Sequence, residues 1–377
     1  MRVLVTGADG FIGRNLVLRL EELPVVDVST YVRNDGSSRL SELVSNVDWV
    51  IHLAGVNRPD TMDEFYVANA GFTATLCDAI AASGHNPSII YSSSIQVGQT
   101  GDYGESKLRA EKALNALHEE TGCSVHIYRL PNVFGKWARP NYNSVVATFC
   151  HNIARNLPIE IHDPDAVIRL VYIDDLVDCF LKLLEDEPAN TLAFEQVPTE
   201  YQATVGELAT MIAEFRTSRV DLVMDAVGQG LLRAMYATYV SFLPENDFDY
   251  LLKKNADARG VFVEILKTKL CGQFSYFTAL PGVTRGGHYH HTKTEKFLVI
   301  SGEALFRFSH KVTGDYFEIS VVGGDARVVE TVPGWAHDIT NVGENELICL
   351  LWANEIYDGD KSDTIFNPIN KDSSPLR

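Results

Sequence analysis

The sequence lacks three features that would each assign it to a particular class of protein. It has no run of 18 or more apolar residues, so no transmembrane helix is predicted. Its N-terminus, MRVLVTGADGFIG, has neither the long apolar stretch nor the small-residue cleavage site of a signal peptide. The 6 cysteines are widely spread without a CxxC pair, which indicates reduced, mostly buried thiols. We therefore expect a cytoplasmic protein that does not insert into a membrane.

Positive charge is also scarce. Asp and Glu number 50 against 32 Lys and Arg, which gives a formal net charge of −18. So acidic a chain has no general attraction for nucleic acid or for an anionic membrane surface, so neither is expected as a partner. An anionic ligand must instead be held by a local pocket. The 377 residues, 46% of them hydrophobic and 22% charged, suit a globular protein of two or three domains.

The pattern of apolar residues changes near residue 244. Before it, short apolar runs alternate with longer helical patterns, which indicates a parallel sheet with helices on both faces. After it, short β-rich runs separated by glycine or proline turns indicate an all-β barrel or sandwich. The predicted strands are 2–5, 25–32, 47–53, 88–92, 125–128, 261–266, 273–280, 295–300, 304–309, 316–322 and 346–352, and the predicted helices are 11–22, 62–83, 104–121, 144–156, 174–186, 204–219 and 229–242. We therefore expect an α/β domain over residues 1–243 and an all-β domain over residues 244–377.

Three glycines, Gly7, Gly10 and Gly13, form a GxxGxxG motif between the first predicted strand and the first predicted helix. Glycine permits a tight turn and a close approach of the backbone, and a helix N-terminus offers free N–H groups to a pyrophosphate. The motif therefore predicts a dinucleotide site, with a simple strand–helix turn as the alternative.

The residue near the end of the second strand distinguishes NAD from NADP. An acidic side chain there binds the ribose 2′-hydroxyl, whereas a basic one accepts the 2′-phosphate. Arg33 lies near that strand end, Asp27 comes too early and Asp35 slightly too late. The sequence therefore favours NADP(H), with a solvated surface arginine as the alternative.

Tyr103 and Lys107 are spaced four residues apart at the start of a predicted helix, so their side chains share one face. A nearby ammonium favours the phenolate, and we therefore expect Lys107 to lower the Tyr103 pKa from its usual value of about 10. Such a tyrosine can give or take a proton near neutral pH. A serine hydroxyl at the end of the preceding strand, within Tyr91–Ser94, can hold a substrate carbonyl.

These motifs, with HLAG (His52–Gly55) and RLPNVFG (Arg129–Gly135), resemble in order the signatures of the extended short-chain dehydrogenase/reductase family over about residues 1–243. The resemblance implies a Rossmann-like fold that binds NADP(H). It also implies a catalytic triad of Ser94, Tyr103 and Lys107.

The same resemblance implies further site residues. Many members act on nucleotide sugars, and Arg169 falls where several of them bind the diphosphate. Asn132, within RLPNVFG, is a second expected substrate-binding residue. The expected cofactor residues, including Arg33 from its own position, are Gly7, Gly10, Phe11, Ile12, Gly13, Arg33, Leu53, Ala54 and Lys107.

The segment FGKWARPNYNSVVATF mixes polar and apolar side chains after RLPNV. Lys136 and Arg139 could meet a diphosphate, and Asn141 or Asn143 a sugar or a base. The alternative is an exposed loop with a capping Asn or Ser before the helix predicted at 144–156.

The all-β half contains a group of residues suited to a metal. His288 and His290 share one face of a strand, because side chains at i and i+2 point the same way. If Glu295 and His337 join them, three imidazoles and one carboxylate suit Zn, Fe, Mn or Ni. A buried polar cluster of this kind is costly without a metal or a hydrogen-bonded partner.

The spacing G-x5-HxH-x4-E-x6-G from Gly282, followed by G-xx-H-xxx-N from Gly334, resembles the two cupin motifs. The second motif departs from the usual pattern, because Pro333 directly precedes Gly334. A metal-free cupin whose histidines act as acid and base, as in sugar 3,5-epimerases, is the alternative. The segment DARGVFVEI resembles the entry strand of those epimerases, which implies Arg259 and Glu264 near substrate.

If all four cluster residues bind metal, the base that removes a proton must lie elsewhere, since a metal-bound imidazole has no free lone pair. Lys267, Tyr276 and His310 are the candidates in the sequence.

Nearly the whole chain resembles the bacterial CapF/WbjC-type enzymes of capsule and O-antigen synthesis, notably in FGKWARPNYNSVVATFC and HYHHTKTEKFLV. The resemblance implies a zinc-binding homodimer that makes the precursor of UDP-N-acetyl-L-fucosamine. The resemblance further implies that the cupin epimerises C3 of a UDP-2-acetamido-2,6-dideoxy-4-hexulose. It implies that the reductase domain then reduces C4 with NADPH to UDP-2-acetamido-2,6-dideoxy-L-talose. The residues leave open a single-activity reductase with a sugar-binding or dimerising cupin, an oxygenase fused to a reductase, and a regulatory NADP sensor.

Overall fold

The computed structural model describes residues 1–59, 61–185, 190–291, 293–311, 313–360 and 363–369. The chain divides into two compact units. The first unit comprises Met1–Ala213 with Arg233–Pro244, and the second comprises Glu214–Leu232 with Glu245–Arg377. That residues 1–243 and 244–377 are two separate domains stays a prediction.

The first unit is built on a parallel sheet with the strand order β2-β1-β3-β4-β5-β8. Its strands are β1 (Arg2–Thr6), β2 (Asp27–Tyr31), β3 (Trp49–His52), β4 (Ser88–Ser94), β5 (Val125–Leu130) and β8 (Leu192–Glu195). Every residue of β4 is buried, as expected for a central strand covered on both faces. Because the strands are parallel, their carboxyl ends meet at one edge, and a ligand site is expected where the order reverses, between β1 and β3.

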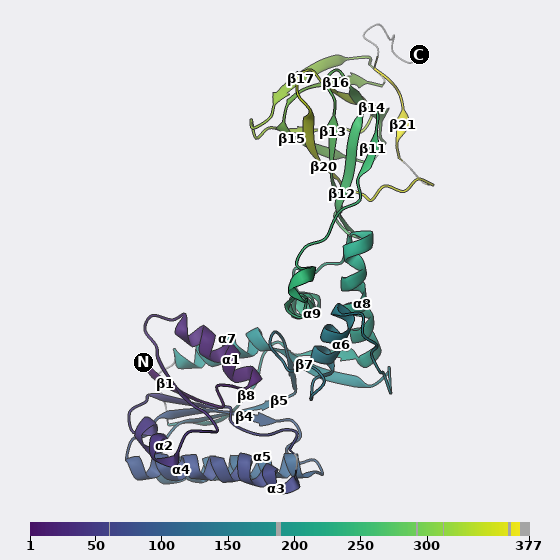
Figure 1. Cartoon of the computed structure of the whole chain (residues 1–377). Helices are drawn as coiled ribbons and strands as arrows, with labels where there is room; N and C mark the ends of the chain where they lie inside the picture. Colours follow the sequence, from purple (N-terminus) through teal and green to yellow (C-terminus); the bar gives the residue numbers. More distant parts are fainter. Residues whose placement is uncertain (60, 186–189, 292, 312, 361–362, 370–377) are drawn as a thin grey trace. The chain divides into compact units, whose positions relative to one another are not determined.

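Helices cover both faces of this sheet (Figure 1). On one face α1 (Phe11–Glu21) packs against α7 (Ile173–Leu184), and on the other α4 (Phe72–Ser83) packs against α2 (Ser37–Val44) and α5 (Asp102–Thr121). The other elements are α3 (Met62–Phe65), the π-helix η1 (Tyr66–Gly71), α6 (Val145–Ala154), α8 (Val205–Asp221), α9 (Gly230–Ser241) and a small sheet of β6 (Asn132–Phe134), β7 (Val167–Tyr172) and β9 (Tyr201–Thr204). The α/β architecture predicted from the sequence is confirmed.

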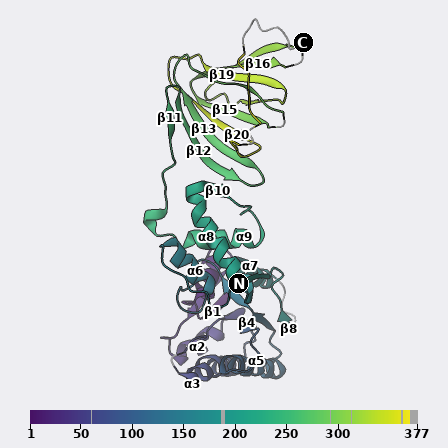
Figure 2. The ribbon, with the colours of Figure 1, turned by 90° about the vertical axis from the view of Figure 1, so that its right-hand side faces the viewer.

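The second unit consists mainly of two sheets. The first sheet contains β10 (Val223–Met224), β12 (Gly260–Thr268), β13 (Gly272–Ala279), β20 (Leu347–Ala353), β15 (Glu295–Ser301) and β18 (Val328–Glu330) in that order, with β11 (Asn255–Asp257) beside β12. The second sheet contains β17 (Tyr316–Val322), β16 (Glu303–His310), β19 (Trp335–Asn341), β14 (Thr284–Tyr289) and β21 (Ile365–Phe366). A 3-10 turn, η2 (Glu245–Asp247), precedes them. Figure 2 shows β12, β13, β20 and β15 side by side.

The two sheets of the second unit enclose a hydrophobic core. On β15, Phe297 and Val299 are buried, and on β16, Phe306 and Phe308 are buried, with an exposed or half-buried residue between each pair. This alternation brings side chains of both sheets into one apolar cluster. The cupin-like all-β fold predicted from the sequence is therefore confirmed.

No helix within the described ranges is long and apolar enough to cross a membrane. Of the cysteines, Cys77, Cys123, Cys150 and Cys349 are buried and all six are free thiols, which confirms the prediction of mostly buried, reduced cysteines.

Candidate functional site

The turn after β1 has room for glycine alone. Gly7 has a φ of +72°, and a Cβ atom there would lie 2.7 Å from the backbone nitrogen of Ala54. A Cβ atom at Gly13 would lie 2.3 Å from the carbonyl oxygen of Gly7. The N-cap of α1 is Gly10, and no side chain caps this helix. The first N–H groups of α1 are therefore available to a phosphate.

A cavity of about 1040 Å³ opens beside this turn. Its walls include five of the predicted cofactor residues: Gly7, Gly10, Arg33, Leu53 and Ala54. Gly13 packs beneath the turn, and Phe11 and Ile12 begin α1 without being among the described wall residues. The size of the cavity and its glycine-lined wall fit a dinucleotide.

Arg33 is the charged residue that follows β2 on the cavity wall. Its guanidinium is largely exposed and lies 3.9 Å from the Glu64 carboxylate. Asp27 is the first residue of β2, at the end of the strand far from the cavity. Asp35 accepts a hydrogen bond from the Val32 N–H at 2.9 Å and is thereby held in the turn. The basic side chain therefore lies on the cavity wall just after β2, and its role toward the cofactor ribose stays a prediction.

Ser94, Tyr103 and Lys107 converge next to this cavity. Ser94 is the last residue of β4, Tyr103 lies in the first turn of α5, and their side chains are hydrogen bonded. The buried Nζ of Lys107 donates to the carbonyl oxygen of Ser92 at 2.8 Å. A Cβ atom at Gly55, on the cavity wall, would lie 3.4 Å from that Nζ. The three residues thus form one site at the carboxyl end of β4.

The prediction that Lys107 lowers the Tyr103 pKa is wrong for this structure. Burial raises the pKa of Tyr103, and the hydrogen bond with Ser94 only partly offsets this effect. The Lys107 ammonium is directed to a backbone carbonyl and lies 4.9 Å from the centre of the Tyr91 ring. Burial lowers the pKa of Lys107 itself to about 8, against the opposing effect of Glu111.

Glu111 is a buried residue of this site that the sequence analysis missed. It lies one helical turn beyond Lys107 and accepts two hydrogen bonds from Arg129, at 3.0 and 2.6 Å. The hydroxyl of Ser93 also donates to it. Glu111 therefore ties α5 to β4 and β5 next to Ser94. Its spacing four residues after Lys107 was the available signal.

A second missed group links the glycine turn to α4. His52 is buried at the end of β3, with Nδ1 2.8 Å from the Thr6 hydroxyl and Nε2 2.8 Å from the Thr73 hydroxyl. Thr73 donates its own proton to the Asn69 carbonyl, so His52 Nε2 must donate and Nδ1 must accept. Burial, followed by the charge of Lys107, lowers the His52 pKa to about 3. A neutral imidazole of one tautomer therefore joins the end of β1 to α4.

Asn69 extends this network to α5, the helix of Tyr103 and Lys107. Its side-chain oxygen accepts from the Val56 N–H at 2.8 Å, and its amide donates to the Val56 carbonyl and to the Ser106 hydroxyl. Ser106 in turn donates to the Tyr103 carbonyl. Asn69 lies in η1, where an i+5 bonding pattern interrupts the helix predicted at 62–83. Such π-turns are often found at functional sites.

The predicted substrate residues Asn132 and Arg169 contact each other, whereas Lys136 contacts a different partner. Asn132 is exposed and donates to the Arg169 carbonyl. Arg169 forms a two-pronged ion pair with Glu200, and Lys136 forms an ion pair with Asp174. Their roles toward substrate stay predictions.

The loop that contains Arg139 ends in a helix cap. The Ser144 hydroxyl accepts the N–H of Ala147 at the start of α6. Arg139 itself is exposed, and its guanidinium lies 4.9 Å from the centre of the Tyr142 ring.

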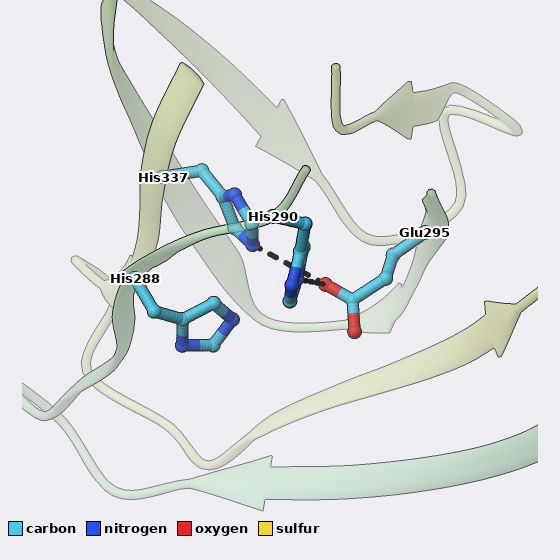
Figure 3. A group of neighbouring side chains, drawn as sticks. All are labelled: His288, His290, Glu295 and His337. Atoms are coloured by element: carbon cyan, nitrogen blue, oxygen red, sulfur yellow. Dashed lines mark hydrogen bonds and ion pairs between the residues drawn. The ribbon is translucent and has the colours of Figure 1, made fainter. Parts of the chain in front are cut away.

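The four predicted metal ligands form one cluster in the second unit (Figure 3). His288 and His337 are paired on β14 and β19, and their ligand atoms lie within 4.8 Å of those of His290 and Glu295. Oε2 of Glu295 lies 3.3 Å from Nε2 of His290 and 3.2 Å from Nε2 of His337. His337 thus joins the other three residues even though Pro333 directly precedes Gly334 in the second cupin motif.

The contacts of His290 indicate that a cation belongs in this cluster. Its Nδ1 lies against the Asp363 backbone carbonyl and its Nε2 against the Glu295 carboxylate, and both oxygens can only accept. His337 repeats the pattern, with Nδ1 3.4 Å from the Trp335 carbonyl. Both ring nitrogens of His290 and of His337 therefore face an acceptor. Without a metal, each nitrogen would have to carry a proton, and both buried rings would be charged imidazoliums. A metal at the Nε2 atoms removes this requirement, and the donor set fits zinc.

The pKa values of Glu295 and His288 are both lowered, Glu295 against the effect of burial and His288 because of it. Burial by itself would raise the pKa of Glu295, but bonds from His290 and His337 and the Lys293 ammonium bring it well below its ordinary value. Burial, followed by the charge of His337, lowers the His288 pKa to about 4. The cluster therefore favours the carboxylate and a neutral His288, the forms that bind metal.

A cavity of about 210 Å³ lies against the cluster. His288 and Glu295 contribute to its wall, together with the missed residues Gln273, Ser275, Lys293, Glu355, Tyr357 and Thr364. Lys293 is buried, and its Nζ lies 3.0 Å from Oε1 of Glu295. Its position between HxH and Glu in the first cupin motif was the signal that the sequence offered.

The expected substrate and base residues of the all-β half lie elsewhere. Arg259 is exposed and ion-paired with Asp257, and Glu264 is paired with Lys267 at 3.5 Å. His310 packs against Trp335. Among the described wall residues of the smaller cavity, none of Arg259, Glu264, Lys267, Tyr276 or His310 occurs.

Both halves of the chain match models of known protein families. Residues 3–193 match the NAD dependent epimerase/dehydratase family, and residues 255–365 match the polysaccharide biosynthesis C-terminal domain.

Three known proteins illustrate the similarity. The chain is 53% identical over 364 residues to UDP-2-acetamido-2,6-beta-L-arabino-hexul-4-ose reductase of Pseudomonas aeruginosa, covering 97% of this chain and 98% of that one. The crystal structure of the capsular polysaccharide assembling protein CapF from Staphylococcus aureus is similar with a TM-score of 0.89 and 39% identity, over 98% of this chain and 100% of that one. UDP-glucuronic acid 4-epimerase from Bacillus cereus, at 18% identity and a TM-score of 0.55 over 64% of this chain and 98% of that one, shares the fold alone.

Proposed function

Because the chain belongs to the NAD dependent epimerase/dehydratase family and is CapF-like in both of its units, we propose that it reduces the C4 ketone of a UDP-linked hexulose. It is an NAD(P)-dependent 4-keto-sugar reductase. The observation that carries the proposal is the convergence of Ser94, Tyr103 and Lys107 beside a dinucleotide-sized cavity.

In full, the proposed enzyme is bifunctional and acts in capsule or O-antigen precursor synthesis. The second unit epimerises C3 of a UDP-2-acetamido-2,6-dideoxy-4-hexulose, and the first unit reduces C4 with NADPH to UDP-2-acetamido-2,6-dideoxy-L-talose. Zinc in the cupin cluster and a homodimeric assembly complete the proposal. The name of the P. aeruginosa relative, which describes a hexul-4-ose reductase, supports the ketone substrate.

The reductase residues divide the work of carbonyl reduction. Bound NADPH supplies the hydride. The Ser94 hydroxyl holds the carbonyl oxygen, and Tyr103 gives its phenolic proton to the alkoxide that develops there. Since burial raises the pKa of Tyr103, the phenol stays protonated and is ready to act as the acid. The Lys107 ammonium lies beside Gly55 on the cavity wall, where it can hold the cofactor.

The preference for NADPH rests on Arg33. Its guanidinium stands on the cavity wall just after β2, where a 2′-phosphate would approach, whereas Asp27 and Asp35 do not occupy that position.

The second unit contains positive charge that can stabilise an enolate. A hydrogen on C3 is acidic because the neighbouring C4 carbonyl stabilises the carbanion as an enolate. A zinc ion held by His288, His290, Glu295 and His337 would add Lewis-acid charge at this site. The buried Lys293 ammonium faces the same cavity and stabilises the oxyanion as a fixed positive charge. Return of the proton to the other face inverts C3.

One observation favours a second candidate, a reductase whose cupin binds sugar without reacting. The three bases considered from the sequence, Lys267, Tyr276 and His310, are absent from the described wall of the cupin cavity. An isolated binding role would then explain a polar wall that contains none of these three bases.

The test is NADPH oxidation with a UDP-linked 4-keto-6-deoxy-N-acetylhexosamine, with the product identified by NMR. Wild type is compared with Tyr103→Phe and His290→Ala. We expect Tyr103→Phe to lose reduction while C3 exchange persists, and His290→Ala to lose C3 exchange while it still oxidises NADPH with a ketone already of the product configuration at C3. Absence of NADPH oxidation by wild type would refute the assignment.

A further inference from the structure

Two loops meet above the carboxyl end of β4, where Ser94 lies. One follows β3 and passes through Val56, a wall residue of the cofactor cavity, to Arg58. The other follows β5 and β6 and contains Arg139 and Tyr142. The first loop starts from β3, which is paired with β4, the strand that ends at Ser94. The second loop starts from β6, two residues after the end of β5, the other neighbour of β4.

The loops are joined by reciprocal contacts. The Arg58 guanidinium donates to the Tyr142 backbone carbonyl, and the Tyr142 hydroxyl donates to the Arg58 carbonyl at 3.1 Å. Both guanidiniums also lie against one ring, since Arg58 is 6.0 Å and Arg139 4.9 Å from the Tyr142 ring centre. Stacking on an aromatic ring orients a guanidinium and leaves its N–H groups free to donate. We call Arg58, Arg139 and Tyr142 the arginine clasp.

The charge of the clasp is not compensated. Within the part of the chain that the structure describes, neither Arg58 nor Arg139 forms an ion pair, although the protein carries 18 more negative than positive charges. Of the three cations expected from the sequence to meet a diphosphate, Arg169 is paired with Glu200 and Lys136 with Asp174, so only Arg139 keeps its charge uncompensated among the described residues. Unpaired positive charge beside the reductase site therefore gathers at the clasp.

We propose that Arg58 and Arg139 bind the diphosphate of the nucleotide-sugar substrate, with Tyr142 as the spacer that holds the two guanidiniums apart. This inference rests on the proposed function. Guanidiniums recognise phosphate oxygens through paired N–H donors, and a clasp fixed before binding loses little freedom when the ligand arrives. The diphosphate of the cofactor has its own place at the uncapped N-terminus of α1, so the clasp serves the second diphosphate.

The test measures binding of UDP and, separately, of NADPH to the full-length protein by calorimetry. The variants are Arg58→Met, Arg139→Met and the double variant. Arg109→Met is the matched control, because Arg109 is also an exposed arginine of the first unit that stacks on a tyrosine, Tyr66, but it is paired with Glu105. We expect each clasp variant to weaken UDP binding about 10-fold and the double variant about 100-fold. Uridine, which has no phosphate, binds equally to all four variants and the wild type.

Two results overturn the inference alone: UDP binding by the double variant that equals wild type, or a loss of NADPH affinity as large as the loss for UDP, which would assign the clasp to the cofactor. A loss of uridine binding to the same extent as UDP would also count against it, because it would reveal a general collapse of the loops. If wild type binds no UDP, the proposed function falls together with this inference.

Discussion

The ammonium of Lys293 lies 3.0 Å from Oε1 of Glu295, while the other oxygen of the same carboxylate faces His290 and His337. The two oxygens of Glu295 therefore have separate partners, and a metal at Oε2 leaves the Lys293 contact in place. This arrangement puts a buried cation at the cavity wall without making it a metal ligand.

Replacement of Lys293 by methionine, which keeps the length of the side chain and removes its charge, tests this relationship. We expect C3 proton exchange at saturating zinc to fall about 100-fold, the size of effect seen when an oxyanion loses a donor. Zinc content by mass spectrometry stays at the wild-type value. Lys296→Met is the control, because Lys296 lies three residues further along, on β15, and its pair with Glu330 is exposed. Exchange at the wild-type rate in Lys293→Met would show that the charge is not used.

The pH dependence of reduction follows from Lys107. Burial lowers its pKa to about 8, whereas the pKa of Tyr103 is raised above its ordinary value. As pH rises, Lys107 therefore loses its proton first, and Tyr103 remains an acid. We expect kcat/KM for ketone reduction to fall above a pH of about 8, since this parameter reports the free enzyme. A profile that stays flat to pH 10 would contradict this role of Lys107.

Glu111 contributes to stability as well as to the site. The Glu111→Gln substitution removes the charge that Arg129 and Ser93 share at a buried position. We expect a loss of about 1 to 3 kcal/mol in the free energy of unfolding, measured with urea. The matched change Glu105→Gln breaks an exposed pair with Arg109 and is expected to cost no more than about 0.5 kcal/mol. Equal effects of the two substitutions would mean that the Glu111 network contributes nothing special.

Arg33 is the residue proposed to select NADPH over NADH. Its replacement by alanine is expected to raise the Kd for NADPH about 10-fold or more, because a charged hydrogen bond to the 2′-phosphate is lost. The Kd for NADH, which has no such phosphate, stays unchanged. Arg39→Ala is the control, because Arg39 is paired with Asp35 in the same turn region. A parallel loss for both cofactors would assign Arg33 a structural role.

The parts of the fold that depend on local pattern could be predicted from the sequence. Apolar periodicity placed α1, α5 and α8 within a few residues of their observed bounds, and the alternation on β15 and β16 predicted the inner face of the barrel. The metal cluster was also predictable, because the HxH spacing places two imidazoles on one face of a strand.

Other features depend on contacts between distant segments and could not be predicted. The strand β7 was missed, because its pairing with β6 and β9 comes from residues more than 30 positions away. The π-turn η1 lies inside a segment that reads as one continuous helix. The raised Tyr103 pKa arises from burial, a property of the packed protein, whereas the spacing to Lys107 indicated only proximity along the helix.

The site residues that the sequence analysis missed also depend on contacts between distant segments. Lys293, Gln273 and Tyr357 line one cavity although they come from separate segments, and a lone lysine or tyrosine in a sequence has no distinguishing pattern. The pairing of Arg169 with Glu200 likewise became visible only when β7 was placed beside β9.

The most direct test of the two-site account is a single turnover in deuterated water. The enzyme receives the UDP-linked 4-keto-6-deoxy-N-acetylhexosamine with NADPH, and the product is examined by NMR for deuterium at C3. The account predicts one deuterium at C3 with inverted configuration and a newly reduced C4, and loss of both the label and the inversion in His290→Ala. A reduced product that retains hydrogen at C3 would contradict it, and the second unit would then be a binding or assembly domain.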